Sequence, residues 1–259
     1  MQAIVYRQLV PQVSTLSAAE LIGSLQLVHD DHEVERPYTV VNFVASADGR
    51  TAVDGRSRGL SDAGDRELHR TLRERADAVL AGTGTIAADD YGRMLPALER
   101  RQRRLAAGRT AEPLAVMVTR SGRLPLAVRL FAEPEARVLV FAPEPAAPSA
   151  APAAAESLAQ VKHELLDPDT PRPLTAALRT LKQRYQVSTL LCEGGPTLLS
   201  ALLREGLVDM LFLTIAPSLV AGQGPAVASG PPLETPADLQ LAGILEREGS
   251  LFLRYTLTR

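Results

Sequence analysis

The chain has 259 residues, of which 46% are hydrophobic and 22% charged, with a formal net charge of −2. This length fits one large α/β domain or two small ones, and the charge gives no electrostatic footprint for nucleic acid or an anionic membrane. One cysteine, Cys192, excludes an intrachain disulfide. Neither a signal peptide nor an apolar run of membrane-spanning length is evident. We expect a cytoplasmic protein that binds neither nucleic acid nor membrane.

The first third of the sequence predicts a strand and two helices after a polar lead-in. Residues 1–36 form this lead-in, with Ser17 as the N-cap of a short helix over residues 18–28. The nearly continuous apolar run at 38–47 is typical of a buried strand. A glycine-containing loop follows, with room for a short strand at 51–53. A helix is predicted to begin after Ser61, acting as its N-cap, and to end near Arg75.

The remaining elements alternate between strands and helices. The arginine-rich stretch 96–110 predicts a solvated helix or a mobile excursion, and the Pro/Ala-rich stretch 142–155 predicts a surface loop. Helices then give way to strands near the C-terminus, where Glu248-Gly249 forms a turn. This order predicts a mixed sheet with helices on its faces. The expected strands cover 78–81, 114–119, 137–141, 161–166, 188–192, 208–217, 239–246 and 250–258, and the expected later helices cover 173–185 and 196–207.

The stretch Leu190–Ala201, LLCEGGPTLLSA, contains the first candidate ligand loop. A buried strand ends, two glycines turn the chain, and a helix begins with Pro196. The unpaired amides and partial positive charge of a helix N-terminus suit a phosphate, and Thr197 could add a hydroxyl donor. Glu193 stands at the carboxyl end of the strand, where ligands bind in open α/β sheets. The Gly-Gly pair alone fits a plain strand–turn–helix connection equally well.

The stretch Ala81–Asp90, AGTGTIAADD, has the same organisation. A strand is expected to lead through a Gly-Thr-Gly-Thr turn into a short helix. Two such turns suit a dinucleotide, because its phosphates and riboses contact the protein at separate points. Asp89 and Asp90 could bind a ribose or the substrate, or they could be a helix-ending acidic pair that faces water.

Other chemistries find little support in the sequence. One cysteine cannot form a thiolate zinc site, and no H-E-x-x-H or G-x-S-x-G motif is present, so we expect no metal. His29 and His32 lie in the polar lead-in and fit a stray surface pair. His69 is expected to face outward from its helix.

Three blocks of the chain closely resemble the reductase domain of riboflavin biosynthesis. They are NFVASADGRTA at 42–52, the stretch from Ser61 to Asp90, and the stretch from Glu193 to Gly222. The resemblance implies an α/β fold like that of dihydrofolate reductase: a mixed, mostly parallel central sheet flanked by helices, with a C-terminal antiparallel hairpin. It also implies NADPH-dependent reduction of a 5-amino-6-(5-phosphoribosylamino)uracil-type substrate to the ribitylamino product. No deaminase half with zinc ligands is visible, so residues 37–259 look like a single stand-alone reductase domain.

The same resemblance implies roles for individual residues. Asp48 and Glu193 are the candidates either for handling the proton that accompanies hydride transfer or for holding the pyrimidine ring, and the sequence does not separate these roles. The implied substrate contacts are Ser57, Arg73, Arg93 and Glu193. The implied cofactor contacts are Ala45, Thr83, Gly84, Thr85, Asp89, Gly194, Gly195, Pro196, Thr197 and Leu198.

The sequence departs from the family pattern in two places. Asn42 stands where many bacterial members carry lysine, and in DDYGR the residue Tyr91 replaces a proline while Arg93 comes earlier than the usual arginine. These departures leave two alternatives open: reduction of a pterin in the manner of dihydrofolate reductase, and a non-catalytic NADP-binding role. Members of the family are commonly dimers, which implies a homodimer here.

Overall fold

The computed structural model describes residues 4–31, 33–143 and 157–257. The expected α/β class, with parallel strands, flanking helices and a C-terminal antiparallel pair, is confirmed. The boundary drawn between a lead-in at 1–36 and one domain at 37–259 stays a prediction. The chain divides into two compact units, the first formed by Met1–Leu27, Thr39–Arg75 and Cys192–Arg259, and the second by Val28–Tyr38 and Ala76–Leu191.

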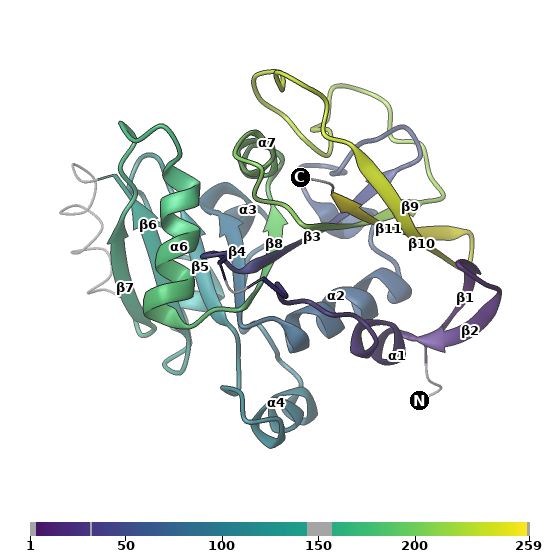
Figure 1. Cartoon of the computed structure of the whole chain (residues 1–259), viewed down its shortest axis with the longest axis horizontal. Helices are drawn as coiled ribbons and strands as arrows, with labels where there is room; N and C mark the ends of the chain where they lie inside the picture. The colour runs from purple at the N-terminus through teal and green to yellow at the C-terminus, as the bar shows by residue number, and fades with distance from the viewer. Residues whose placement is uncertain (1–3, 32, 144–156, 258–259) are drawn as a thin grey trace. The chain divides into compact units, whose positions relative to one another are not determined.

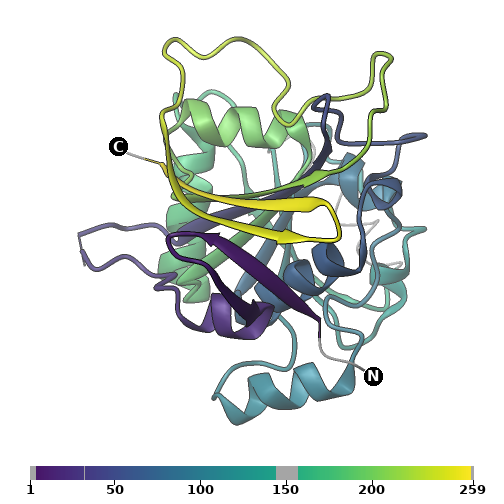
Figure 2. The ribbon, with the colours of Figure 1, turned by 90° about the vertical axis from the view of Figure 1, so that its right-hand side faces the viewer.

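The first unit is built on strands from both ends of the sequence (Figure 2). The parallel pair of this unit joins β3 to β9, and the pairs from β9 outward to β2 are antiparallel. The strands follow the order β2 (Ser14–Ser17), β1 (Val5–Val10), β10 (Leu239–Arg247), β11 (Ser250–Leu257), β9 (Met210–Ala216) and β3 (Tyr38–Ser46).

The N-terminal segment takes part in this sheet, which the sequence interpretation did not anticipate. β1 pairs with β10, and Tyr6 on β1 is 1% exposed. The Tyr6 ring packs edge-on against Phe252, with 5.1 Å between centroids, and its hydroxyl donates to the carbonyl of Gly64 at 2.7 Å. The predicted turn at Glu248 and Gly249 is confirmed. Both residues have positive φ, as a two-residue hairpin of the right twist requires.

Three helices complete the first unit: α1 (Ala18–Gly23), α2 (Ala63–Arg75) and α7 (Pro196–Arg204). Ser17 caps α1 as predicted, but that helix ends at Gly23 and is shorter than expected. The N-cap predicted for α2 was wrong by one residue. Asp62 Oδ1 accepts the amide of Asp65 at 2.7 Å, whereas the hydroxyl of Ser61 donates to the carboxylate of Asp65. The short strand considered at 51–53 is reduced to an isolated bridge between Val53 and Arg56.

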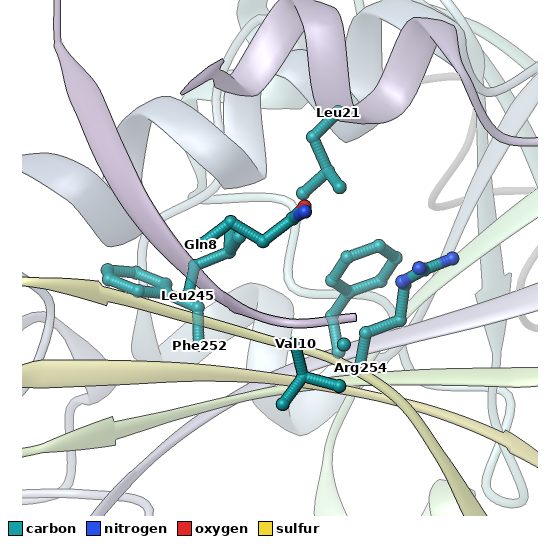
Figure 3. Close-up of a pocket in the computed structure, with 8 residues that line it drawn as sticks. Gln8, Val10, Leu21, Leu245, Phe252 and Arg254 are labelled. Atoms are coloured by element: carbon teal, nitrogen blue, oxygen red, sulfur yellow. The ribbon is translucent and has the colours of Figure 1, made fainter. Parts of the chain in front are cut away.

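A small cavity lies among β1, α1 and the C-terminal hairpin of the first unit (Figure 3). Its volume is about 10 Å³, and its walls include Gln8, Leu21 and Phe252. A space of this size holds at most one water. It is therefore a packing gap and not a ligand site.

The second unit contains a parallel sheet in the order β4 (Ala78–Gly82), β5 (Leu114–Val118), β6 (Arg137–Ala142) and β7 (Gln160–Leu165). Each of these strands was predicted to within about two residues. The side chains of β4, β5 and β6 are largely buried, as expected for parallel strands, whereas those of β7 are exposed or partly exposed. The helices of this unit are α3 (Thr83–Ala88), α4 (Leu98–Ala106) and α6 (Pro173–Tyr185), which appear with the sheet in Figure 1. β8 (Thr189–Gly194) carries the chain from the second unit into the first.

The arginine-rich stretch is mostly the solvated helix that its composition indicates, with one exception. Arg104 on α4 is 2% exposed. It donates to the carbonyls of Ala76 at 2.6 Å and Thr110 at 2.9 Å. The Pro/Ala-rich loop predicted at 142–155 falls almost entirely outside the described residues. In the part of the chain that the structure describes, no helix is long and apolar enough to cross a membrane.

Candidate functional site

Glu193 is the centre of a buried ion-pair cluster in the first unit. It lies near the end of β8, and its side chain is 4% exposed. Arg73 on α2 binds both carboxylate oxygens, with Nε to Oε1 and Nη2 to Oε2 each at 2.6 Å. His69 Nε2 lies 2.7 Å from Oε1. The two-pronged arginine contact is the strong and directional form of a carboxylate–guanidinium pair.

The electrostatics of the cluster keep Glu193 ionised. Burial by itself raises the pKa of this carboxyl group. The charges of Arg73 and His69, together with their hydrogen bonds, more than offset burial and hold the pKa of Glu193 well below its ordinary value. At neutral pH Glu193 is therefore a hydrogen-bond acceptor with its charge balanced inside the protein, and it is a poor source of a proton.

The prediction that His69 faces outward was wrong. His69 and Arg73 are four residues apart on α2, so their side chains lie on the same face of the helix. Since Arg73 reaches Glu193, His69 reaches it as well, although its side chain stays 28% exposed. The spacing of four from an arginine already chosen as a site residue was the sequence signal that could have identified His69.

Asp48 belongs to a separate network that ties two loops of the first unit together. Its carboxylate accepts the hydroxyl of Ser46 at 2.6 Å and the amides of Val220 and Ala221 at 3.0 and 2.8 Å. These hydrogen bonds, that of Ser46 first, lower the pKa of Asp48 to about 2. Asp48 is thus ionised at neutral pH. These hydrogen bonds hold the two loops together. Because the carboxylate is ionised, Asp48 is disfavoured as the proton donor.

Packing inside the protein explains why residue 194 in the Gly194-Gly195 turn is a glycine. The sequence alone suggested that these glycines let a ligand approach the backbone. Gly194 has φ +95°, and a Cβ placed there would lie 2.5 Å from Cζ of Phe43. This position therefore requires glycine whether or not a phosphate approaches it. Gly195 is the N-cap of α7.

The amide of Thr197 at the start of α7 is a candidate donor for an anion, whereas the amides of Leu198 and Leu199 already donate to the carbonyl of Gly195. No side chain caps this helix, and Pro196 at its first position has no N–H. The helix dipole favours negative charge beside Thr197 and Leu198 in the first turn. This part of the chain is therefore compatible with a phosphate of a dinucleotide.

Two of the remaining residues, Asn42 and Ala45, lie on β3, and Ser57 lies in the loop that follows this strand. Ala45 is on β3 and 1% exposed, one residue before the Ser46 that binds Asp48. Asn42 lies in the middle of the same strand, and its amide oxygen is buried without a hydrogen-bond partner among the described residues. Ser57 begins a short 3-10 helix at Ser57–Gly59.

The predicted cofactor residues of the second unit follow β4, but their local structure differs from the prediction. Thr83, Gly84 and Thr85 form the first turn of α3 and not a separate turn before it, and Asp89 is the C-cap of that helix. The helix begins earlier because Gly82 serves as its N-cap. A Cβ on Gly84 would meet no atom within 4 Å. Packing in the described structure therefore does not demand this glycine, and its predicted contact with the cofactor stays a prediction.

Arg93, a predicted substrate contact, is held by three carboxylates of the second unit. Its guanidinium lies 3.1 Å from Glu112 and 2.8 Å from both Glu133 and Glu135. Hydrogen bonds to Glu135 and Glu133 raise the pKa of Arg93 above its ordinary value. A phosphate would have to compete with these partners, so the substrate role of Arg93 stays a prediction. Asp90 is bound by Arg129 at 2.8 Å, which matches the surface alternative for that residue.

Residues 37–252 match the model of the family described as the RibD C-terminal domain. A 2,5-diamino-6-ribosylamino-4(3H)-pyrimidinone 5′-phosphate reductase of Archaeoglobus fulgidus is 34% identical over 203 residues, which are 75% of this chain and 87% of that protein. The riboflavin biosynthesis protein RibD of Mycobacterium tuberculosis is 36% identical over 195 residues, which are 74% of this chain but 45% of that protein.

Solved structures show the same fold. A pyrimidine reductase-like protein from Corynebacterium diphtheriae superposes with a TM-score of 0.79 at 23% identity, covering 94% of this chain and all of that one. RibD of Acinetobacter baumannii gives a TM-score of 0.67 at 27% identity, covering 87% of this chain and 59% of that one. The match thus spans 87% of the archaeal reductase, but 45% of the Mycobacterium tuberculosis RibD and 59% of the Acinetobacter baumannii RibD chain.

Proposed function

The chain belongs to the RibD C-terminal domain family, and from this membership we propose that it is an NADPH-dependent reductase of a ribosylamino-pyrimidine 5′-phosphate in riboflavin biosynthesis. The observation that carries the proposal is the match across 87% of an archaeal reductase of such a substrate. The 5-amino-6-(5-phosphoribosylamino)uracil type, reduced to its ribitylamino product, is the substrate class that we propose. A cytoplasmic location is part of the same proposal.

The start of α7 supports the cofactor part of this proposal. The backbone amide of Thr197, next to Gly195 and Pro196 in the first turn of α7, would bind a phosphate of NADPH. NADPH supplies the hydride when bound. The protein supplies orientation and electrostatics, since Ala45 on a buried strand and the ionised Asp48 and Glu193 are held rigidly by their neighbours.

The Glu193 cluster supports the substrate part. A carboxylate with a balanced charge accepts hydrogen bonds from ring or exocyclic N–H groups without changing its protonation state. Arg73 fixes the position of this carboxylate through two hydrogen bonds. We propose that Arg73 and Glu193 orient the substrate as one unit, with Ser57 as a further contact.

The direct test measures NADPH oxidation with two substrates in parallel. The decrease in NADPH absorbance reports the rate. Turnover of the deaminated ribosylamino-pyrimidine phosphate alone supports the proposal, whereas turnover of dihydrofolate alone would replace it with a pterin reductase. The pterin alternative is favoured by one observation, the engagement of Arg93 by three glutamates, which removes a cation from phosphate recognition. NADPH binding without turnover on either substrate would indicate a binding protein.

A variant tests the cofactor site separately from the substrate. Gly195→Val places a branched side chain at the N-cap of α7, where the backbone is proposed to approach a phosphate. NADPH affinity, measured by fluorescence titration, is expected to fall while the thermal midpoint stays measurable. Unchanged NADPH affinity would place the cofactor elsewhere.

We also propose a homodimer that forms through the C-terminal hairpin. Leu239 and Leu241 lie two residues apart on β10 and are 45% and 43% exposed, and an apolar patch of this kind is typical of an interface. Leu251 on β11 is 37% exposed and lies nearer the turn of the hairpin, where it pairs with Glu246.

A further inference from the structure

A cavity of about 370 Å³ lies where the parallel strands of the second unit begin. Leu114, Arg137 and Gln160, the first residues of β5, β6 and β7, are among its walls. The loop at 108–110 and the end of α6 at 185–187 form the rest. The proposed cofactor residues of this unit follow the last residue of β4. The cavity is therefore at the opposite edge of the same parallel strands, and no role proposed above includes it.

Positive charge dominates the cavity. Its single lining carboxylate, Asp77, is already fully used. Asp77 Oδ1 accepts from Arg109 at 2.8 Å, and Oδ2 accepts the amides of Ser188 and Thr189, each at 2.9 Å. The cations that line the cavity are Arg104, Arg109, Arg137 and Lys162.

Two of these cations have no carboxylate partner. Arg137 donates to the hydroxyl of Thr110 at 3.0 Å, and neither Arg137 nor Lys162 forms an ion pair within the described residues. Both side chains are exposed. Lys162 pairs in register with Leu139, two residues after Arg137, so Arg137 and Lys162 lie on the same face of neighbouring strands.

The rest of the lining suits an organic group. Leu114, Val138, Leu139 and Val187 contribute apolar residues, and Tyr185 adds an aromatic ring. The Tyr185 hydroxyl donates to Glu164 at 2.7 Å, which fixes the orientation of that ring. A volume of this size lies within the usual range for small-molecule sites. An inorganic ion alone would leave the apolar part of the lining without a partner.

We propose that this cavity binds a small phosphorylated organic molecule at a second site, separate from the reductase site. The phosphate lies between Arg137 and Lys162, and the organic part lies against Tyr185 and the apolar wall. A phosphomonoester carries nearly two negative charges at neutral pH, which matches the two cations that lack a carboxylate. The planar guanidinium of Arg137 also suits two-pronged phosphate binding.

Lysine chemistry provides a test that does not depend on enzymatic activity. Pyridoxal 5′-phosphate is the probe, because its aldehyde condenses with a lysine amine to an imine, with loss of water, and borohydride reduces that imine to a stable amine. Lys162 and Lys182 are the two lysines of the sequence, and Lys182 on α6 does not line the cavity. The labelled fraction of each lysine peptide of the full chain is measured by mass spectrometry, with pyridoxal as the probe that lacks phosphate.

We expect pyridoxal 5′-phosphate to label Lys162 about tenfold faster than Lys182, since a hydrogen bond to a charged group is worth about one factor of ten or more. Pyridoxal is expected to label both at similar rates, and excess inorganic phosphate is expected to slow the labelling of Lys162 alone. Equal labelling of both lysines by the phosphorylated probe would overturn the proposal. So would the same preference with pyridoxal, which would show intrinsic reactivity of Lys162.

Variants test whether the cavity causes the preferential labelling of Lys162 by pyridoxal 5′-phosphate. Arg137→Gln is expected to abolish it, Arg137→Lys to retain part of it, and Arg70→Gln, which removes an exposed cation on α2, to leave it unchanged. A thermal midpoint of Arg137→Gln near that of the wild type excludes misfolding as the cause. Retention of the full preference in folded Arg137→Gln would contradict the placement of the phosphate. Neither result depends on NADPH oxidation, so the two proposals can fail independently.

Discussion

The contacts of Glu193 give a residue-scale prediction about stability. Glu193→Gln removes the carboxylate charge that binds the guanidinium of Arg73, whose side chain is 13% exposed. We expect a loss of about 3–5 kcal/mol in the free energy of unfolding, the usual cost of removing one partner of a buried pair. Urea unfolding at neutral pH measures it. His69→Gln is the matched control, and its effect is expected to be smaller because His69 is more exposed.

The difference in the free energy of unfolding between the wild type and Glu193→Gln is expected to depend on pH in one direction. The folded-state pKa of Glu193 lies well below its ordinary value of 4.5. The contribution of the ionised carboxylate is therefore complete above about pH 4.5 and is lost as the pH falls through the folded-state pKa. We expect the difference between wild type and Glu193→Gln to be constant near neutrality and to narrow in acid. A difference that widens in acid would show that the carboxyl group is protonated in the folded state.

Asp48 gives a second residue-scale prediction, which concerns catalysis. Because its pKa is about 2, Asp48 does not change its charge across the neutral range. Asp48→Asn should lower kcat by loosening the loop at Val220 and Ala221 while leaving the shape of the pH–rate profile unchanged. NADPH oxidation at a series of pH values measures this. Loss of a limb of the profile in the variant would instead make Asp48 a proton-transfer group.

At the scale of elements, the Gly194 position predicts a large effect from one added methyl group. Gly194→Ala combines a positive φ with a contact between the new Cβ and Phe43. We expect it to cost more than about 1 kcal/mol in the free energy of unfolding. Gly206→Ala is the control, because Gly206 has φ +66° but open space around its Cβ. It therefore reports the backbone cost alone.

A double-mutant cycle separates the two causes. Phe43→Leu shortens the side chain that the new Cβ would meet, so it should recover part of the loss in Gly194→Ala. Chemical denaturation of both single variants and of the double variant gives the coupling energy. Strict additivity would show that φ at Gly194, and not the contact with Phe43, determines the cost.

The sequence predicted most elements because their local signals agree with their tertiary setting. The strands β4, β5 and β6 are apolar runs that become buried, and α6 begins at a proline and ends before a left-handed Gln186. It did not predict β1, because the polar and apolar residues around Tyr6 gain their pattern only by pairing with β10, at the other end of the chain. Long-range pairing leaves little trace in a local window.

The candidate site was predicted in part for a similar reason. Glu193 and Arg73 were both predicted to be site residues and the structure brings them together, but their contact with each other and with His69 depends on how α2 meets the end of β8. The three-carboxylate setting of Arg93 depends on loops that converge from 112, 133 and 135. No local pattern encodes such convergence. Glycines at 194 and 84 have different physical reasons, although their sequence contexts look alike.

At the scale of the whole molecule, the exposed leucines of the C-terminal hairpin predict an oligomeric state. Leu241→Arg is expected to convert a homodimer into a monomer, because it places a charge in the centre of the proposed apolar interface. Light scattering coupled to size-exclusion chromatography measures the mass. Leu105→Arg, at an exposed leucine of α4, is the control and should not change it. A monomeric wild-type protein would refute the interface.

The pairing of β1 with β10 has a consequence for the order in which the ribosome delivers the protein. The strands β4 to β7 emerge together and can find their partners during translation. β1 is synthesised more than 200 residues before β10, so the edge of β1 that pairs with β10 stays open over that part of synthesis. Arg7 and Gln8 belong to the part of β1 that pairs with β10. We expect their charged and amide side chains to limit pairing of this open edge with other chains until β10 is made.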